Sequence, residues 1–270
     1  MIVVKVGGEI VKSGAIAEIA PDIAELQRSG ERVVIVHGGG PQATELQKQL
    51  GQTPHIVAGR RVTDAATLDV MKMIVAGLVN VDLCAALHRA GARAVGLHGA
   101  SAGAIAAKKR PPKVMAGAGP APIDFGLVGD VTGINRELLE TLLEKNFTPV
   151  LACLGCGDDG QVYNINADTV SNQVAVALAA NALVVVSDVP GVLRDVRDPS
   201  TRIARMTKKE SDEAIASGVV TKGMIPKLEE AFAAIASGVK SVLIVGKLAR
   251  GELARAVRTP GSVGTVLVAQ

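Results

Sequence analysis

Short runs rich in valine and isoleucine recur along the whole chain, and stretches with helical spacing separate them. Between the first two runs, for example, apolar side chains repeat at the interval that places them on one helix face, at Ile16, Ile19, Ile23 and Leu26. Repeated alternation of strand and helix predicts a mainly parallel sheet with right-handed crossovers. The predicted fold class is therefore α/β, a three-layer αβα sandwich with an open, mainly parallel central sheet. Strands are predicted at residues 2–6, 32–37, 94–97, 148–153, 183–187 and 241–245.

The length of 270 residues accommodates one large α/β domain or two smaller lobes that share a sheet. Hydrophobic residues make up 48% of the chain and aromatic residues only 1%, so the core must consist of Val, Ile, Leu and Ala. Such a composition is typical of a parallel sheet that helices cover on both faces. We predict a boundary near residue 180, which gives an N-terminal lobe of residues 1–180 and a C-terminal lobe of residues 181–270.

The charge balance argues against nucleic acid as a partner. The formal net charge is +3 and no long basic run occurs, whereas a small anionic ligand requires only a few local cations. The three cysteines form no disulfide framework, which is typical of a reducing cytoplasm. The opening residues lack a basic segment and charges interrupt the apolar runs, so we predict a cytoplasmic protein without membrane spans. Cys153 and Cys156 form a single CxxC pair where a structural zinc site needs four ligands, so no protein-bound metal is predicted.

The segment of residues 64–90 has a helical pattern with two apolar stripes. One stripe contains Leu68, Met71, Val75, Val79, Leu83 and Leu87, and the other contains Val70, Ile74, Gly77, Val81 and Cys84. A helix that is apolar on two sides is either deeply buried or shared with another subunit. The pattern alone leaves both readings open.

Two glycine-rich turns follow predicted strands. Lys5 lies inside the first apolar strand, where a lysine is costly to bury unless it meets an anion, and Gly7 and Gly8 come directly after this strand. The second turn runs from His37 to Pro41 before a helix, and its glycines can direct backbone N–H groups toward a negative oxygen. His37 is expected to orient this turn rather than to act as a base. Both turns are also compatible with ordinary tight connections, so each alone is weak evidence for an anion site.

Three further segments place charged or amide side chains next to helices. One arginine of the pair at residues 60–61 can hold a carboxylate in bidentate fashion, although an exposed basic turn would look the same. Asn164 and Asn166 share one side of an extended segment, and Asp168 follows at a helix start, where a capping role is equally ordinary. Lys227 lies near another helix N-terminus, where a lysine is unfavourable unless an anion is present.

Taken together, these segments resemble the amino acid kinase family in their order and spacing. The resemblance extends over essentially the whole chain through the motifs VKVGGEI, VIVHGGGPQ, GRRVTD, AVGL, YNINADT, VVVSDVPGVL, GMIPK and GTVLV. Within the family, the chain is similar to the members that use ATP to phosphorylate the side-chain carboxylate of N-acetyl-L-glutamate. The resemblance thus implies an ATP-dependent phosphotransferase of arginine biosynthesis, and we expect a homodimer through the 64–90 helix.

The same resemblance implies that the N-terminal lobe holds the amino acid and the C-terminal lobe holds ATP. Lys5 and Lys227 would flank the transferred phosphoryl group, with Asp168 between them. Backbone N–H groups toward the phosphoryl group and the reacting end of the substrate would come from Gly8, Gly39 and Gly40. The α-carboxylate of the substrate would be held by Arg61 and Asn164. The nucleotide site would be lined by Ser187, Asp188, Leu193, Val220 and Thr221.

The implied reaction needs no general base, because the attacking carboxylate is already ionised at neutral pH. It needs neutralisation and in-line alignment of two anions instead. Mg²⁺ would arrive on the ATP phosphates rather than in a protein cage. The closest alternative is a kinase of the same fold and chemistry that acts on aminoadipate or glutamate linked to a carrier protein in lysine biosynthesis. The segments NINADT and GMIPK favour the free acetylated amino acid over that alternative.

Overall fold

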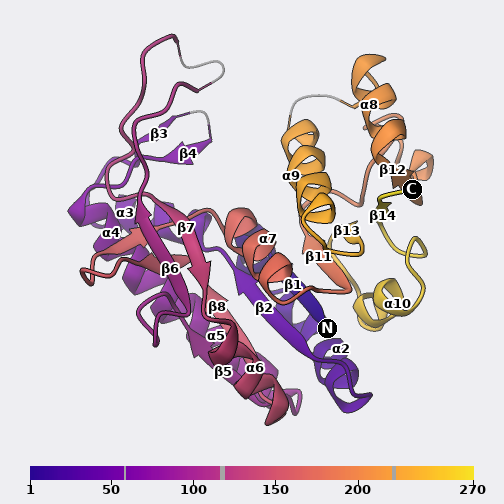
Figure 1. Ribbon diagram of the computed structural model, residues 1–270, viewed down its shortest axis with the longest axis horizontal. Coiled ribbons are helices and arrows are strands. Elements are labelled where there is room, and N and C mark those ends of the chain that lie inside the picture. The colour runs from indigo at the N-terminus through magenta and orange to yellow at the C-terminus, as the bar shows by residue number, and fades with distance from the viewer. Residues whose placement is uncertain (58, 116–118, 221–222) are drawn as a thin grey trace.

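One eight-stranded sheet forms the centre of the computed structural model, which describes residues 1–57, 59–115, 119–220 and 223–270 (Figure 1). In order across the sheet, the strands are β12 (Arg205–Thr207), β14 (Thr265–Val268), β13 (Val242–Val245), β11 (Ala182–Val186), β1 (Ile2–Val6), β2 (Val33–His37), β8 (Thr148–Ala152) and β5 (Ala94–Leu97). All neighbouring strands pair in parallel except β13 and β14, which are antiparallel. The prediction of an open, mainly parallel sheet is confirmed.

Helices cover both faces of this sheet (Figure 1). The face toward the viewer carries α6 (Arg136–Glu144), α7 (Ala167–Ala177) and α9 (Met224–Ala236). The opposite face carries α2 (Ile16–Arg28), α5 (Asn80–Arg89) and α10 (Glu252–Arg258). Strand ends lead into α1 (Gly8–Lys12), α3 (Gly40–Gln49) and α8 (Lys208–Ala216), and a short 3-10 turn, η2, spans Pro199–Thr201. The arrangement is the three-layer sandwich that the strand and helix pattern predicts.

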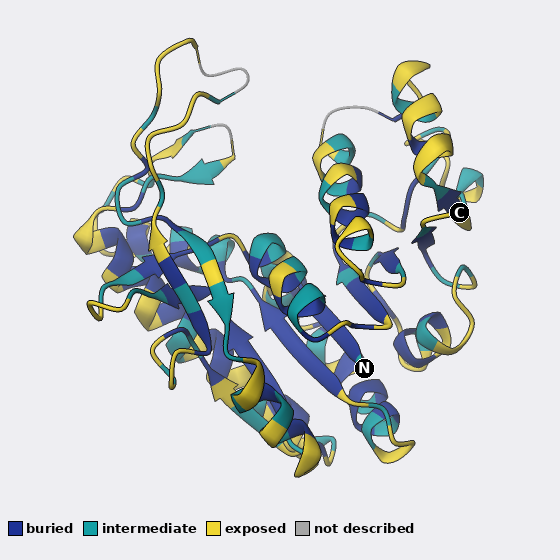
Figure 2. Ribbon diagram, in the orientation of Figure 1, coloured by how far each residue is buried: buried dark blue, intermediate teal, exposed yellow. Residues whose placement is uncertain are grey.

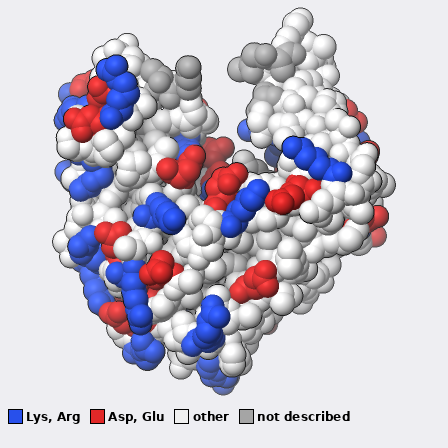
Figure 3. Space-filling view, turned by 180° about the vertical axis from the view of Figure 1, so that it is seen from behind, with Lys and Arg blue, Asp and Glu red and all other residues white. Residues whose placement is uncertain are grey.

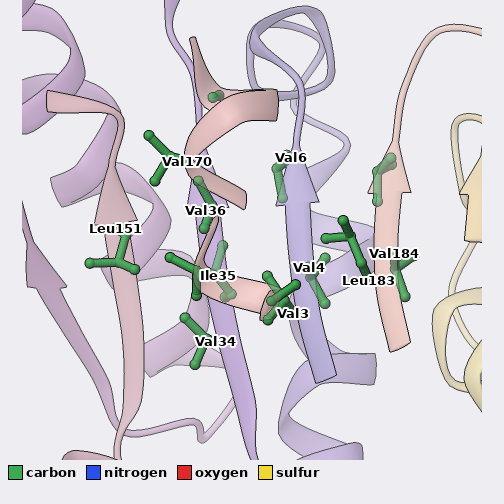
Figure 4. Close-up of a cluster of buried hydrophobic side chains, with 14 of the residues drawn as sticks. Val3, Val4, Val6, Val34, Ile35, Val36, Leu151, Val170, Leu183 and Val184 are labelled. Carbon is green, nitrogen blue, oxygen red and sulfur yellow. The ribbon is translucent and has the colours of Figure 1, made fainter. Parts of the chain in front are cut away.

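The core consists of aliphatic side chains because every strand in the middle of the sheet is covered on both faces. All positions of β1, β2 and β8 are buried, and Figure 2 shows the centre of the sheet as its most buried region. In Figure 4, Val3 and Val4 of β1 lie beside Ile35 of β2 and Val184 of β11. Each such side chain contributes about 1.5–3 kcal/mol when fully buried. Lys5 is the one charged residue within β1, so its presence in this core requires a specific partner.

The sheet is continuous across the predicted boundary at residue 180. β11, the first strand after that boundary, pairs with β1 over five residue positions, from Ile2 opposite Ala182 to Val6 opposite Val186. We call residues 1–180 the N-terminal part and residues 181–270 the C-terminal part. Their independence as two lobes remains a prediction.

Two smaller sheets lie beside the strand ends. A four-stranded sheet contains β10 (Val162–Asn164), β9 (Leu154–Cys156), β6 (Ile105–Lys109) and β7 (Gly129–Ile134), in that order, and a two-stranded ribbon contains β3 (Ile56–Val57) and β4 (Arg60–Arg61). The Pro- and Gly-rich stretch 110–125 is predicted to be a surface loop or hairpin. It connects the antiparallel strands β6 and β7, with Lys113 paired to Ile123, so the hairpin prediction is confirmed for its described residues.

Within the 64–90 segment, residues 65–89 are helical, and the middle of this helix is a π-helix. It comprises α4 (Ala65–Met71), η1 (Lys72–Val79) and α5. The first predicted stripe is entirely buried. The second is not a single face, because Val70 and Ile74 are buried whereas Val81 is 62% exposed. The wider i→i+5 turns of η1 rotate the following residues relative to an α-helical register, so this stripe is buried at Val70 and Ile74 and exposed at Val81.

An apolar face of this helix is nevertheless open to solvent. It consists of Met73, Leu78 and Val81, each more than half exposed. By length and composition alone, the helix from Ala65 to Arg89 is apolar enough to cross a membrane. The core helix of a soluble protein can meet the same two criteria. Half of the most apolar window of the Ala65–Arg89 helix is buried inside the protein.

Candidate active site

A cleft of about 620 Å³ lies where β1, β2 and β8 end. The chain leaves β1 and β2 in glycine turns and leaves β8 at Cys153, and all three exits line the cleft. Ligands of open α/β sheets bind at this carboxyl edge of the strands. The cleft gathers six of the residues predicted from the sequence, namely Lys5, Gly8, Gly39, Gly40, Arg61 and Asn164.

The two glycine turns touch each other. A Cβ atom on Gly8 would lie 2.6 Å from Cδ of Pro41, so only glycine fits there. The Gln42 amide Nε2 donates to the Gly8 carbonyl at 3.0 Å and ties the second turn to the first. Sequence reasoning missed Gln42, although its place directly after Pro41 in the glycine motif is the signal that could have identified it.

The backbone N–H groups of these turns divide into two sets. Those of Gly7 and Gly38 donate to the carbonyls of Val186 and Val6. Within the described chain, the N–H groups of Gly8, Gly39 and Gly40 have no backbone or side-chain acceptor. Gly8 and Gly40 begin α1 and α3, and such first-turn donors are free because no preceding helical carbonyl exists for them. Free N–H groups at helix starts favour a bound anion.

His37 is buried at the end of β2 and holds the second turn in shape. Its Nδ1 lies 3.0 Å from the Gly38 carbonyl, and its Nε2 lies 2.9 Å from Asn80 Nδ2. A carbonyl can only accept and an amide nitrogen can only donate, so these partners fit a neutral imidazole protonated at Nδ1. Burial lowers the pKa of His37 to about 4. This geometry suits the predicted orienting role and not that of a base exposed to substrate.

Lys5 projects from β1 and meets Asp168, with 2.7 Å between Nζ and Oδ1. Lys5 is 8% exposed, so the carboxylate supplies the partner that a buried ammonium requires. Asp168 lies in the first turn of α7, but Asn166 is the residue that caps this helix, through its side-chain oxygen and the Asp168 N–H. The capping alternative for Asp168 is therefore wrong, and its carboxylate is directed to Lys5.

Arg61 on β4 is fixed against α3 before any ligand binds. Its guanidinium donates to the side chain of Gln47, to the Gly40 carbonyl at 3.0 Å and to Thr44 Oγ1 at 2.6 Å. Burial lowers the pKa of Arg61 from its ordinary value, yet an arginine remains charged at neutral pH. The wall of the cleft therefore carries a positioned cation next to the free N–H groups of the second turn.

Asn164 ends β10 on the same wall. Its Nδ2 donates to Thr63 Oγ1 at 3.0 Å, and the residue is buried. Arg110, which sequence reasoning missed, also lines the cleft, and its guanidinium pairs with Asp130 at 2.7 Å. Its position in a loop rich in Pro and Gly carried no signal for a binding residue, because only the return of β7 beside β6 brings Asp130 near it.

Lys227 lies outside this cleft, in the first turn of α9. Its Nζ lies 3.7 Å from a carboxylate oxygen of Asp188. Lys227 and Asp168 form no ion pair with each other but line one small pocket together with Glu230 and Asn172. Burial, with the Asp168 charge as a second cause, raises the pKa of Glu230 from its ordinary value. Asp168 is thus paired with only one of the two lysines.

The residues predicted for the nucleotide are dispersed over the C-terminal part. Ser187 is buried directly after β11, and Asp188 lines a separate hollow with Gly246 and Lys247. Leu193 pairs with Arg202 in an isolated bridge. Val220 is buried between α8 and α9, and Thr221 lies outside the described residues. None of the four described residues lines the 620 Å³ cleft.

The CxxC pair does not gather further ligands. Cys153 is buried beneath Lys5, and burial raises the pKa of its thiol to about 12. Cys156 ends β9 and carries a free thiol, as Cys153 does. In the parts of the chain that the structure describes, no three His, Cys, Asp or Glu side chains are close enough to hold a metal ion.

The cleft therefore combines free N–H groups, a paired lysine and a fixed arginine, whereas Lys227 lies outside it beside Asp188. Such an arrangement can hold an anionic acceptor beside the phosphoryl group of a donor, because each negative oxygen finds a cation or an N–H group.

Comparisons with known proteins agree with this chemistry. The model of the amino acid kinase family matches residues 1–246. A relative from Sorangium cellulosum (strain So ce56), named acetylglutamate kinase, is 62% identical over 99% of this chain and 94% of its own length. The solved structure of smu.665 from Streptococcus mutans UA159 is 32% identical, with a TM-score of 0.77 over 100% of this chain and 98% of that one.

A second solved structure is the N-acetylglutamate synthase from Neisseria gonorrhoeae complexed with coenzyme A and N-acetyl-glutamate. It is 26% identical, with a TM-score of 0.83 over 100% of this chain and 59% of that one. Because the family model covers nine-tenths of the chain and a relative matches it at high identity over nearly its full length, this chain belongs to the amino acid kinase family.

Proposed function

We propose that the chain transfers the γ-phosphoryl group of ATP to the side-chain carboxylate of N-acetyl-L-glutamate and so forms N-acetyl-L-glutamyl 5-phosphate, a step of arginine biosynthesis. The observation that carries this proposal is the identity of 62% with a protein named acetylglutamate kinase over nearly the full length of both chains. A structural relative is solved with N-acetyl-glutamate bound, which supports the same substrate class. The relatives' names favour this reading over a carrier-linked aminoadipate or glutamate kinase.

On the substrate side, we assign the α-carboxylate to Arg61 and Asn164. Arg61 already has three protein acceptors, so its guanidinium cannot swing out of the cleft wall easily. Arg61 binds the Gly40 carbonyl, so this fixed cation would hold the α-carboxylate while the side-chain carboxylate meets the free N–H groups of Gly8, Gly39 and Gly40.

At the reacting end, an oxygen of the side-chain carboxylate attacks the γ-phosphorus of ATP. A carboxylate–phosphorus bond forms, the bond from the γ-phosphorus to the β–γ bridging oxygen breaks, and ADP leaves with that electron pair. Lys5 and the free N–H groups would stabilise the equatorial oxygens, and Lys227 would approach the leaving diphosphate. Asp168 would hold Lys5 in place through the 2.7 Å contact.

ATP itself would occupy the C-terminal part, with Ser187, Asp188, Leu193 and Val220, and Thr221 beyond the described residues, as the proposed contacts. Membership of a kinase family implies ATP as the phosphoryl donor. Mg²⁺ prefers phosphate oxygens, water and one or two carboxylates, so we assign it to the ATP phosphates, where it would neutralise charge on the phosphates.

The test is ATP turnover with N-acetyl-L-glutamate in the presence of hydroxylamine, which traps an acyl phosphate as a hydroxamate. Glutamate, aspartate and N-acetyl-aminoadipate are measured in parallel, and the Lys5→Ala protein serves as the control for contaminating kinases. A hydroxamate formed far most strongly with N-acetyl-L-glutamate supports the proposal. The absence of product with every free amino acid would reject it and favour the carrier-linked alternative.

We also propose a homodimer through the exposed apolar face of the 64–90 helix, namely Met73, Leu78 and Val81. Figure 3 shows, on the N-terminal part seen from behind, a broad area with few charged side chains. Changing Leu78 to Glu would place a charge in the proposed interface, so light scattering should then report a monomer. A dimer that survives Leu78→Glu and Val81→Glu together would reject this interface. The free thiols are compatible with the proposed location in a reducing cytoplasm.

A further inference from the structure

A second hollow, of about 550 Å³, lies where the N-terminal and C-terminal parts meet on the face shown in Figure 3. Its walls are α2, the end of α5 and the loop before α10. It shares no lining residue with the cleft described above. A volume of this size is typical of sites for small molecules rather than single ions.

Three arginines line this hollow, Arg28, Arg89 and Arg250. Among the described residues, none of them has an ion-pair or side-chain hydrogen-bond partner, whereas Arg110, Arg136 and Arg258 elsewhere each pair with a carboxylate. The helix dipole accounts for two of these arginines without any ligand, because it favours a cation in the last turn of a helix. Arg28 and Arg89 lie in the last turns of α2 and α5.

The helix dipole does not account for a cation at Arg250. Arg250 lies two residues before the start of α10, where the same dipole disfavours a cation. It comes from the C-terminal part, while Arg28 and Arg89 come from the N-terminal part, so three guanidinium groups from separate elements face one space. An anion bound there would be shared by both parts of the molecule.

The acidic residues of the hollow are already engaged. Asp22 is buried in α2, and its two carboxylate oxygens accept the N–H groups of Gly251 at 2.8 Å, Leu253 at 2.9 Å and Ala254 at 3.3 Å. Glu25 pairs with Arg258 at 2.7 Å. These contacts hold α10 against α2 and leave the guanidinium groups as the unpaired charges, so the walls are formed before a ligand arrives.

We propose that this hollow binds a small polyanion, a metabolite with two or more phosphate or carboxylate groups, across the junction of the two parts. Guanidinium groups recognise both oxyanions through paired N–H donors. The site is separate from the catalytic cleft, so the inference does not depend on which amino acid the enzyme phosphorylates.

Titration calorimetry with pyrophosphate and, separately, with citrate tests the proposal and distinguishes the two sources of charge. We expect the unmodified chain to bind at least one probe saturably and the Arg89→Gln, Arg250→Gln double variant to bind it at least tenfold more weakly. Arg136→Gln is the matched control, since Arg136 is an exposed arginine on the other face that pairs with Glu140.

Unchanged melting temperatures of the variants establish that they are folded, and Arg28→Gln provides a second variant in a different wall. Saturable binding that weakens in both the double variant and Arg28→Gln supports the site. Binding that is equal in all variants would place the probe elsewhere, for example in the catalytic cleft, and would overturn the proposal. A lack of saturable binding of both probes would overturn it as well.

Discussion

Lys5 and Lys227 are the two lysines that sequence motifs single out, and their surroundings differ sharply. Lys5 lies inside a buried strand, is 8% exposed and contacts Asp168 at 2.7 Å. The Lys227 side chain lies on a helix end, is 33% exposed, and is 3.7 Å from an Asp188 carboxylate that is itself largely in solvent. The Lys5–Asp168 pair lies against the core of the sheet, whereas the Lys227–Asp188 pair lies at the surface.

The difference extends to the elements around each lysine. On the N-terminal side, Gln42, His37 and Arg61 all hold the glycine turns in one shape. On the C-terminal side, the residues proposed to bind the nucleotide are dispersed over several loops. We infer that the Lys5 side is organised in advance by packing, whereas Lys227 is positioned by its ligand, because its contact with the largely exposed Asp188 is long, at 3.7 Å.

The largest effect is expected from removing either lysine. Lys5→Ala and Lys227→Ala should each lower turnover at least about a hundredfold, since one preorganised charge contributes on the order of 3 kcal/mol to the transition state. Only Lys5→Ala should also lower the melting temperature, because it removes the partner of Asp168 from the core. Turnover by hydroxamate formation and melting by circular dichroism measure the two effects, with exposed Lys72→Ala as the control. Near-normal turnover in either variant would contradict the assignment.

The next effect is a pH dependence of stability on the N-terminal side. Folding depresses the pKa of His37 from 6.5 to about 4, so between these values the unfolded chain binds the proton that the folded chain rejects. Stability is therefore fully present above pH 6.5 and falls by about 3 kcal/mol as the pH drops toward 4. Denaturant unfolding across this range measures it, with His37→Gln as the comparison. Parallel pH profiles of the two proteins would show that His37 is not the cause.

A smaller effect separates the two adjacent arginines. Arg61→Ala should raise the KM for N-acetyl-L-glutamate about ten- to a hundredfold with little change in the KM for ATP, since a hydrogen bond to a charged group contributes about 1.5–3 kcal/mol. Arg60→Ala is the matched control, because Arg60 lines the same cleft but makes no side-chain hydrogen bond or ion pair to any residue that the structure describes. Steady-state kinetics with each substrate varied distinguish them. A rise in the KM for ATP alone would indicate instead that Arg61 contacts the nucleotide.

The smallest effect concerns the C-terminal side. Folding raises the pKa of Glu230, so its charged form is disfavoured in the folded chain, and stability is lost as the pH rises from about 4.5 through the raised value. Glu230→Gln should therefore raise the melting temperature by roughly 1–2 °C at pH 7.5 and leave it unchanged at pH 4, the effect being small because Glu230 is half-exposed. Exposed Glu229→Gln is the control. An equal gain at both pH values would rule out the charge as the cause.

Much of the fold could be predicted from the chain because its signals are local. Valine-rich runs predict the strands to within about one residue at either end, and the glycines, Pro41 and Lys227 mark helix starts as they are observed. The short strands β12 and β14 were not predicted. Residues 265–268 pair with both β13 and β12, and residues 205–207 pair with β14 at the sheet edge, so long-range hydrogen bonds define both short strands.

By itself, the sequence determined the layered α/β architecture, the order of the glycine turns and the identity of the residues that can carry charge, since each depends on local spacing. Only the tertiary structure decided which of them meet. It placed Asp168 against Lys5 and left Lys227 to Asp188, tied Gln42 to Gly8 and brought Arg110 into the cleft. These contacts join residues that are far apart in the chain. In the same way, the π-helical turns of η1 determine which residues of the 64–90 helix are exposed, and α-helical spacing does not predict this. Such outcomes depend on how whole elements pack, and no local pattern encodes them.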